Sequence, residues 1–263
     1  MGSVEKILKH ERLVVVIGLL LVVILAWGYT LSGAGMEMNV FEMTSHASES
    51  TATADWTPAY IALMLTMWWV MMIAMMLPSA APTILLAAAL NNRSTSEQPP
   101  FGNTGFFTFG YLLAWLFFSA VAVTAQWFLQ NAGQLSAMMQ SQNQFLTAGL
   151  LIAAGAWQLS PIKQACLRHC RSPVEFLTRR RRPGNRGALL MGAEHGSYCL
   201  GCCWFLMALL FVGGVMNLYW IVGLAFYVLV EKLLPRGRVD RENDRSGPAR
   251  LGSRGAGYLV LAI

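Results

Sequence analysis

Charged residues are scarce in this sequence. Asp, Glu, Lys and Arg make up 12% of its 263 residues, whereas soluble domains contain about 25%. Hydrophobic residues make up 56%, and several apolar runs reach the roughly 20 residues that a helix needs to cross a bilayer. The short alternating segments of membrane β-barrels are missing. We therefore exclude a soluble protein and a barrel, and predict an all-α, polytopic transmembrane helix bundle in contact with membrane lipid.

Lys and Arg are absent from two of the connections between apolar runs. Residues 34–57 contain four acidic residues but no Lys or Arg, and residues 130–144 contain no charge, whereas residues 163–186 contain eight Lys or Arg. Because cytoplasmic loops of membrane proteins are rich in Lys and Arg, residues 163–186 and both termini are predicted to be cytoplasmic. This topology accounts for the net charge of +6, so no nucleic-acid partner is expected.

Six spans fit this topology. They cover residues 13–33, 58–90, 105–129, 145–162, 187–215 and 218–234. Residues 1–235 are thus predicted to form a single transmembrane domain, and residues 236–263 a basic cytoplasmic tail. The apolar end of that tail, residues 257–263, is too short to cross a bilayer, and a truncated, short seventh span is the alternative.

Ionisable side chains interrupt the fifth predicted span. His195, Cys199, Cys202 and Cys203 fall on one face of a helix that turns by about 100° per residue. Such groups are costly at membrane depth and usually mark a site. Each of them alone could be an ordinary core residue, but together they predict metal ligands. Glu194 would set the charge or the protonation of His195.

The second predicted span is expected to complete this site, because one straight helix cannot surround an ion. Met67, Met71 and Met75 lie along one stripe of that span, and thioethers are soft ligands. The two spans would pack antiparallel, with Gly192 and Gly196 allowing a neighbouring helix to approach closely. Methionine also fills helix contacts without binding a metal, and this alternative stays open.

Two further clusters of possible donors lie outside the predicted spans. The first belongs to the acidic external segment and contains Met36, Met38, Met43 and His46. It could gather a copper ion, and an ordinary loop is an equal alternative. The second belongs to the basic connection and contains Cys166, His169 and Cys170. Its thiols would suit an exit site or a sensor.

The donor types indicate which metal is expected. Thiolate, thioether and imidazole together favour monovalent copper, with zinc as the alternative if the methionines only pack. The sequence contains no nucleotide-binding loop, so transport would be passive, gradient-driven or dependent on a partner such as a metal-donor or acceptor protein.

A second hypothesis makes the protein an enzyme. Cys199 and Cys202 form a C-x-x-C pair, which is also typical of a thiol–disulfide oxidoreductase. Burial beside aromatic residues disfavours the reactive thiolate that such an enzyme requires, so we place this hypothesis second to metal binding.

Two motifs carry a resemblance to a known family. They are MWWVMMIAMMLPSAAP at residues 67–82 and GAEHGSYCLGCCWFLMALLFVGGVMNLYW at residues 192–220. With the sequence from about residue 58 to 235, they resemble a bacterial family of predicted metal-binding integral membrane proteins, a domain of unknown function. The resemblance implies six to seven helices in the bacterial inner membrane, with metal bound near the second motif. The basic tail departs from the longer apolar finish expected of that family.

Overall fold

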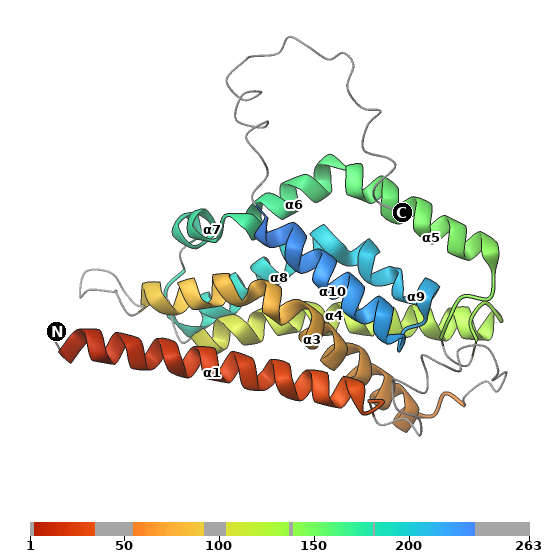
Figure 1. Ribbon diagram of the computed structural model, residues 1–263, viewed down its shortest axis with the longest axis horizontal. Helices are drawn as coiled ribbons and strands as arrows, with labels where there is room; N and C mark the ends of the chain where they lie inside the picture. The colour runs from red at the N-terminus through yellow and green to blue at the C-terminus, as the bar shows by residue number, and fades with distance from the viewer. Residues whose placement is uncertain (1–2, 35–54, 92–103, 137–138, 181, 235–263) are drawn as a thin grey trace, which may run out of the picture. The chain divides into compact units, whose positions relative to one another are not determined.

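The computed structural model describes residues 3–34, 55–91, 104–136, 139–180 and 182–234 (Figure 1). These residues form helices and no strand, apart from one isolated bridge between Leu135 and Ser141. The helices are α1 (Ser3–Leu31), α3 (Pro58–Asn91), α4 (Thr104–Asn131), α5 (Gln144–Leu159), α6 (Pro161–Arg171), α7 (Pro173–Arg179), α8 (Gly184–Ala208), α9 (Leu210–Gly213) and α10 (Leu218–Leu233). The predicted donors Met36, Met38, Met43 and His46 and the predicted tail at residues 236–263 lie outside the described residues.

Four described segments are long and apolar enough to cross a membrane. They are Leu13–Leu31, Pro58–Leu90, Thr104–Asn131 and Gly184–Gly213. Helices α5 and α6 meet at a bend of 63° and would count as a fifth span if they were taken together. Helix α10 has 16 residues, fewer than the roughly 20 that a bilayer requires. The structure thus supports four or five spans, and the predicted sixth is not confirmed.

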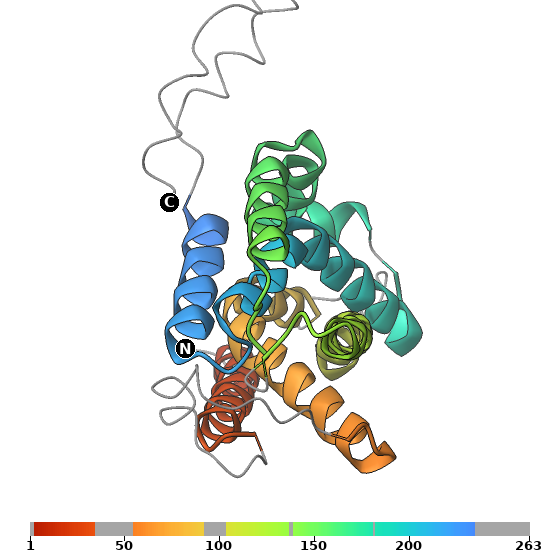
Figure 2. The same cartoon turned by 90° about the vertical axis from the view of Figure 1, so that its right-hand side faces the viewer.

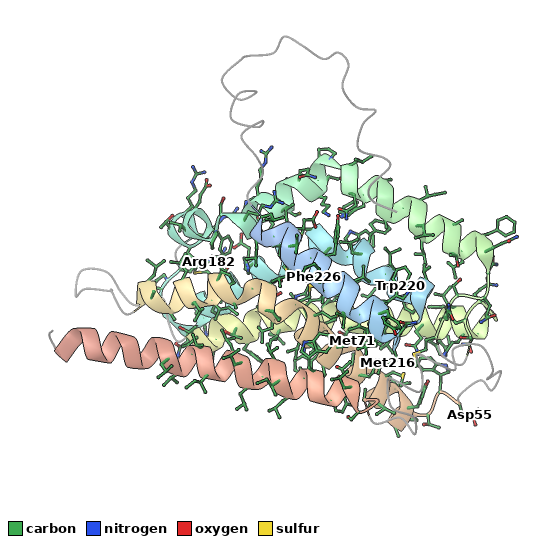
Figure 3. All side chains as sticks on the ribbon, viewed as in Figure 1. Asp55, Met71, Arg182, Met216, Trp220 and Phe226 are labelled. Atoms are coloured by element: carbon green, nitrogen blue, oxygen red, sulfur yellow. The ribbon has the colours of Figure 1, made fainter. Side chains whose placement is uncertain are left out.

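Large apolar side chains cover the outer surface of these helices. Leu25 is 63% exposed, Phe117 69% and Phe226 65%. Soluble monomers rarely leave broad apolar surfaces open to water, so this exposure is compatible with a lipid-facing surface. Figure 3 shows Asp55 and Arg182 at opposite ends of the helices, as expected if the acidic and the basic connections face opposite sides of a membrane.

Helix α8 packs along α4 with its backbone in contact with the backbone of α4. A Cβ atom at Gly192 would overlap the carbonyl oxygen of Phe107, and one at Gly110 would overlap the carbonyl oxygen of Leu189. Glycine at these positions removes the side chains that would keep the helices apart. The predicted close approach at Gly192 therefore occurs, and the neighbouring helix is α4.

Helix α3 packs chiefly against α1, α4 and α10. This differs from the predicted antiparallel packing of the second span directly on the fifth. The physical reason lies in two large side chains of α3 that bond to α4. The indole of Trp68 donates a hydrogen bond to Gln126, and that of Trp69 donates one to the carbonyl oxygen of Leu112. Helix α4 therefore lies next to both α3 and α8.

The basic connection at residues 163–186 is largely helical, although the sequence analysis treats it as a loop. The Ser160 side chain accepts hydrogen bonds from the backbone N–H groups of Ile162 and Lys163, and Pro161 occupies the first turn of α6. Both features are typical of a helix start, which explains why α5 ends at Leu159 and α6 begins in a new direction. Helix α6 packs against α8 and α10. Figure 2 shows α5 and α1 on opposite sides of the helices.

Candidate metal centre

Three cysteines of α8 form the centre of the candidate site. Cys199, Cys202 and Cys203 are all buried, because the helical period turns them toward α4, α6 and α10 rather than outward. The thiols of Cys202 and Cys203 lie 3.0 and 2.9 Å from the carbonyl oxygen of Cys199. Each cysteine of the chain is a free thiol, so these sulfurs are available for a metal.

The sulfur of Cys199 has polar neighbours from two other helices. The hydroxyl of Tyr111, on α4, lies 3.1 Å from it. The ammonium group of Lys232, on α10, donates a hydrogen bond to it at 2.9 Å and a second one to the hydroxyl of Ser79, on α3, also at 2.9 Å. The same Tyr111 hydroxyl donates to the carbonyl oxygen of Met76, on α3, at 3.2 Å. Side chains of α4 and α10 therefore contact the sulfur of Cys199 directly, and α3 joins them through Ser79 and Met76.

Helix α6 adds a fourth cysteine to this group. The thiol of Cys170 interacts with the sulfurs of Cys199 and Cys202. Cys170 is only half-buried, so it lies between the buried thiols and the surface. The structure thus brings Cys170, which the sequence analysis assigns to a separate cluster, to the predicted central site.

The other members of that predicted cluster also pack against α8. The sulfur of Cys166 lies so close to Gly201 that a Cβ atom there would be 2.9 Å away. The ring of His169 stacks on Tyr198 with centroids 4.1 Å apart and planes 3° from parallel. Its Nδ1 atom lies 2.9 Å from the carbonyl oxygen of Ala165. Cys166 and His169 therefore extend the row of possible donors toward the surface.

His195 is buried one turn before Cys199. Its ring lies among those of Phe107, Tyr111 and Phe176, with centroids 6.1, 5.9 and 5.4 Å away. Its Nδ1 atom has no hydrogen-bond partner among the residues that the structure describes. A buried polar atom without a partner is unfavourable, and a ligand bound to this nitrogen would relieve that cost.

The side chain of Glu194 contacts two arginines near the end of α7. Its carboxylate forms ion pairs with Arg180 at 2.5 Å and with Arg182 at 3.6 Å. These contacts link α8 to the basic end of α7. The predicted role of Glu194 in setting the charge or protonation of His195 stays a prediction.

The methionines of α3 are all buried. Met67, Met71 and Met75 are at most 1% exposed, and Figure 3 shows Met71 among the helices. The methionine that reaches a site thiol is Met76, whose sulfur lies 4.0 Å from that of Cys203. Met64 instead accepts a hydrogen bond from Gln126 at 3.6 Å. The methionine contact to the thiols thus comes from Met76, which lies outside the predicted stripe.

Sequence reasoning missed Lys232, Tyr111 and Met76 as members of the site. Lys232 lies in the last turn of α10, where a lysine is an ordinary feature of a helix end, so the sequence contains no special signal for it. Tyr111 and Met76 carry no such signal, since both are common in apolar helices. Their roles follow only from the way α4 and α3 pack beside α8.

The donor chemistry fits copper(I). Soft sulfur ligands favour this ion over magnesium, calcium or manganese, and the four clustered thiols and the thioether of Met76 supply them. Within the described ranges, no group of three or more His, Cys, Asp or Glu side chains is arranged in metal-binding geometry. Bound metal would therefore require these side chains to rearrange.

Comparison with known proteins agrees with this chemistry. Residues 65–243 match the model of the PpoB2 family, which is described as a copper chaperone. No curated protein matches the chain, and neither does any solved structure. The matched region contains the whole candidate site, from Met76 to Lys232, and covers more than half of the chain. The chain therefore belongs to the PpoB2 copper chaperone family.

Proposed function

We propose that this protein is an integral membrane copper chaperone that holds copper(I) on Cys199 and Cys202 and passes it to an acceptor protein. The observation that carries the proposal is the group of side chains gathered around these two sulfurs. Lys232 and Tyr111 lie 2.9 and 3.1 Å from the sulfur of Cys199, and the thiols of Cys170 and Cys203 interact with both sulfurs. The family membership supports copper as the cargo. It does not favour the alternative of a thiol–disulfide oxidoreductase.

Other donors would assist these two thiolates. His195 offers an unpartnered nitrogen one helical turn away, and Met76 and Cys203 offer sulfur atoms on the α3 side. Met67, Met71 and Met75 stay candidate ligands in our proposal, and so does zinc as an alternative ion. Because soft ligands exchange on copper(I) without a change of oxidation state, a chain of sulfur donors can pass the ion along.

The half-buried Cys170 and Cys166 suggest the direction of transfer. Both lie on α6, which also carries Lys163, Arg168 and Arg171, and we propose that copper leaves the site through them toward the cytoplasmic side. The full topology of six spans, with both termini inside a bacterial inner membrane, belongs to the same proposal. The abundance of exposed apolar side chains supports the membrane location.

Copper analysis of the purified full-length protein tests this function. The protein would be loaded with copper(I) without oxygen in detergent, desalted and analysed for copper, zinc and protein. We expect about one copper per chain in the wild type, and loss of that copper in the variant Cys199→Ser/Cys202→Ser. X-ray absorption should detect sulfur ligands. Tyr219→Phe, at a residue that is 79% exposed, is the control and should retain copper.

Two results would contradict the proposal. One is a wild-type protein that binds no copper under these conditions. The other is a Cys199→Ser/Cys202→Ser variant that binds as much copper as the Tyr219→Phe control. Trapping of cellular thiols addresses the oxidoreductase alternative, since only that alternative predicts a Cys199–Cys202 disulfide that disappears with reductant.

A further inference from the structure

A buried lysine lies at the candidate site. Lys232 is 8% exposed, and its ammonium group contacts the sulfur of Cys199 and the hydroxyl of Ser79. Its neighbour Glu231 does not neutralise it, because the Glu231 carboxylate pairs with Lys163 at 2.6 Å. A buried ammonium is unfavourable unless an opposite charge lies nearby. The sulfur of Cys199, as a thiolate, is the group in contact that can supply that charge.

Lys232 places a positive charge beside the proposed ligands. Its ammonium group lies 2.9 Å from the sulfur of Cys199, and Cys202 and Cys203 follow about one turn later on the same helix. Metal ligands must be deprotonated thiols or neutral imidazoles. A metal ion held on Cys199 would therefore lie close to a fixed positive charge.

We propose that Lys232 makes the site selective for a monovalent over a divalent cation. This inference rests on the proposed function, because it assumes that metal binds at Cys199 and Cys202. Copper(I) adds one positive charge beside Lys232, whereas zinc(II) or copper(II) adds two, in surroundings of low dielectric where repulsion between like charges is costly. Lys232 therefore discriminates by charge where sulfur ligands alone would accept zinc as well.

The chain offers a matched control for Lys232. Lys163 is also fully buried, and its ammonium group bonds to Glu231 rather than to a sulfur. Replacing Lys163 removes a buried lysine of the same kind, but leaves the charge beside Cys199 unchanged. A change in metal preference that is specific to position 232 can thus be separated from a general effect of losing a buried charge.

The experiment measures the affinities of the full-length protein in detergent for copper(I) and for zinc(II). Each affinity is obtained by anaerobic competition with a chromophoric chelator of that metal, and the ratio of the two is compared between proteins. We expect Lys232→Met and Lys232→Gln to shift this ratio toward zinc by at least about tenfold relative to wild type. Lys232→Arg, which keeps the charge, and Lys163→Met should keep the ratio within about threefold.

The outcomes are distinguishable. A wild-type protein that binds no copper(I) overturns the proposed function. A wild type that binds copper(I), together with a Lys232→Gln variant of unchanged ratio, overturns only the role of Lys232. If Lys232→Met does not fold, Lys232→Gln decides, because glutamine, although one atom shorter than lysine, keeps a neutral hydrogen-bond donor at this position. An equal shift in Lys163→Met would also overturn the inference, since it would assign the effect to lost packing.

Discussion

Gly192 lies so close to the carbonyl oxygen of Phe107 that no Cβ atom fits between them. This contact joins α8 to α4 one helical turn from His195. Helix α4 carries Tyr111, whose hydroxyl reaches Cys199. The absence of a side chain at position 192 therefore determines how close Tyr111 comes to the thiols.

Gly192→Ala should destabilise the protein and weaken the site. The added methyl group would have to displace backbone rather than a flexible side chain, and overpacking of this kind costs about 1–3 kcal/mol. Thermal unfolding in detergent and copper retention would both be measured. Gly149→Ala is the control, because a Cβ atom there meets nothing within 4 Å, and it should leave both properties unchanged. Equal behaviour of the two variants would contradict the assigned contact.

Tyr111→Phe should lower the copper(I) affinity without unfolding the protein. The change removes the hydroxyl that lies 3.1 Å from the Cys199 sulfur, and one hydrogen bond contributes about 1 kcal/mol, or roughly fivefold in Kd. Chelator competition measures the effect. Tyr219→Phe, at a residue that is 79% exposed, serves as the comparison. An unchanged affinity in Tyr111→Phe would mean that Tyr111 does not act on the bound state.

Glu231→Gln should destabilise the packing of α6 on α10. It leaves the ammonium group of Lys163 buried without its counter-charge, and breaking one partner of a buried pair costs roughly 3 kcal/mol or more. We expect a lower unfolding temperature and faster alkylation of Cys170, which α6 carries. The double variant Lys163→Met/Glu231→Gln should recover part of the loss, because it removes the uncompensated charge. No recovery would point to lost packing instead.

The thiols should react with a maleimide in two groups. Cys166 and Cys170 are half-buried, whereas Cys199, Cys202 and Cys203 are at most 1% exposed. Brief labelling followed by mass spectrometry should modify the first group well before the second. Copper(I) should protect Cys170 more than Cys166, and a copper chelator should remove that protection. Labelling of Cys199 at the rate of Cys166 would contradict the burial described above.

The sequence predicts the α8 part of the site well, because the spacing of His195 and the cysteines along one helix needs only the helical period. The same holds for the helical class, which follows from the apolar runs. Burial of Met67, Met71 and Met75 is consistent with the predicted stripe. Whether these methionines are ligands stays a prediction, since the sulfur that touches a site thiol is that of Met76.

Contacts between distant segments could not be predicted in the same way. Cys170 comes close to Cys199 because the chain bends at Ser160 and Pro161, between α5 and α6. The high charge of residues 163–186 makes the segment read as a loop, so neither the helix nor the bend is predicted. The choice of α4 rather than α3 as the main partner of α8 depends on Gly110 meeting Leu189. A single sequence does not show which of its 24 glycines makes such a close helix contact.

The position of Lys232 also has a consequence for the time course of synthesis. Because Cys170, Cys199, Cys202 and Cys203 all precede α10, a growing chain has made each of its site thiols before the lysine emerges from the ribosome. The four thiols can come together before Lys232, their ionic partner, has been synthesised. Completion of the site thus coincides with the arrival of the last described helix, so a chain that stops short of α10 has all five cysteines and lacks the cation that contacts Cys199.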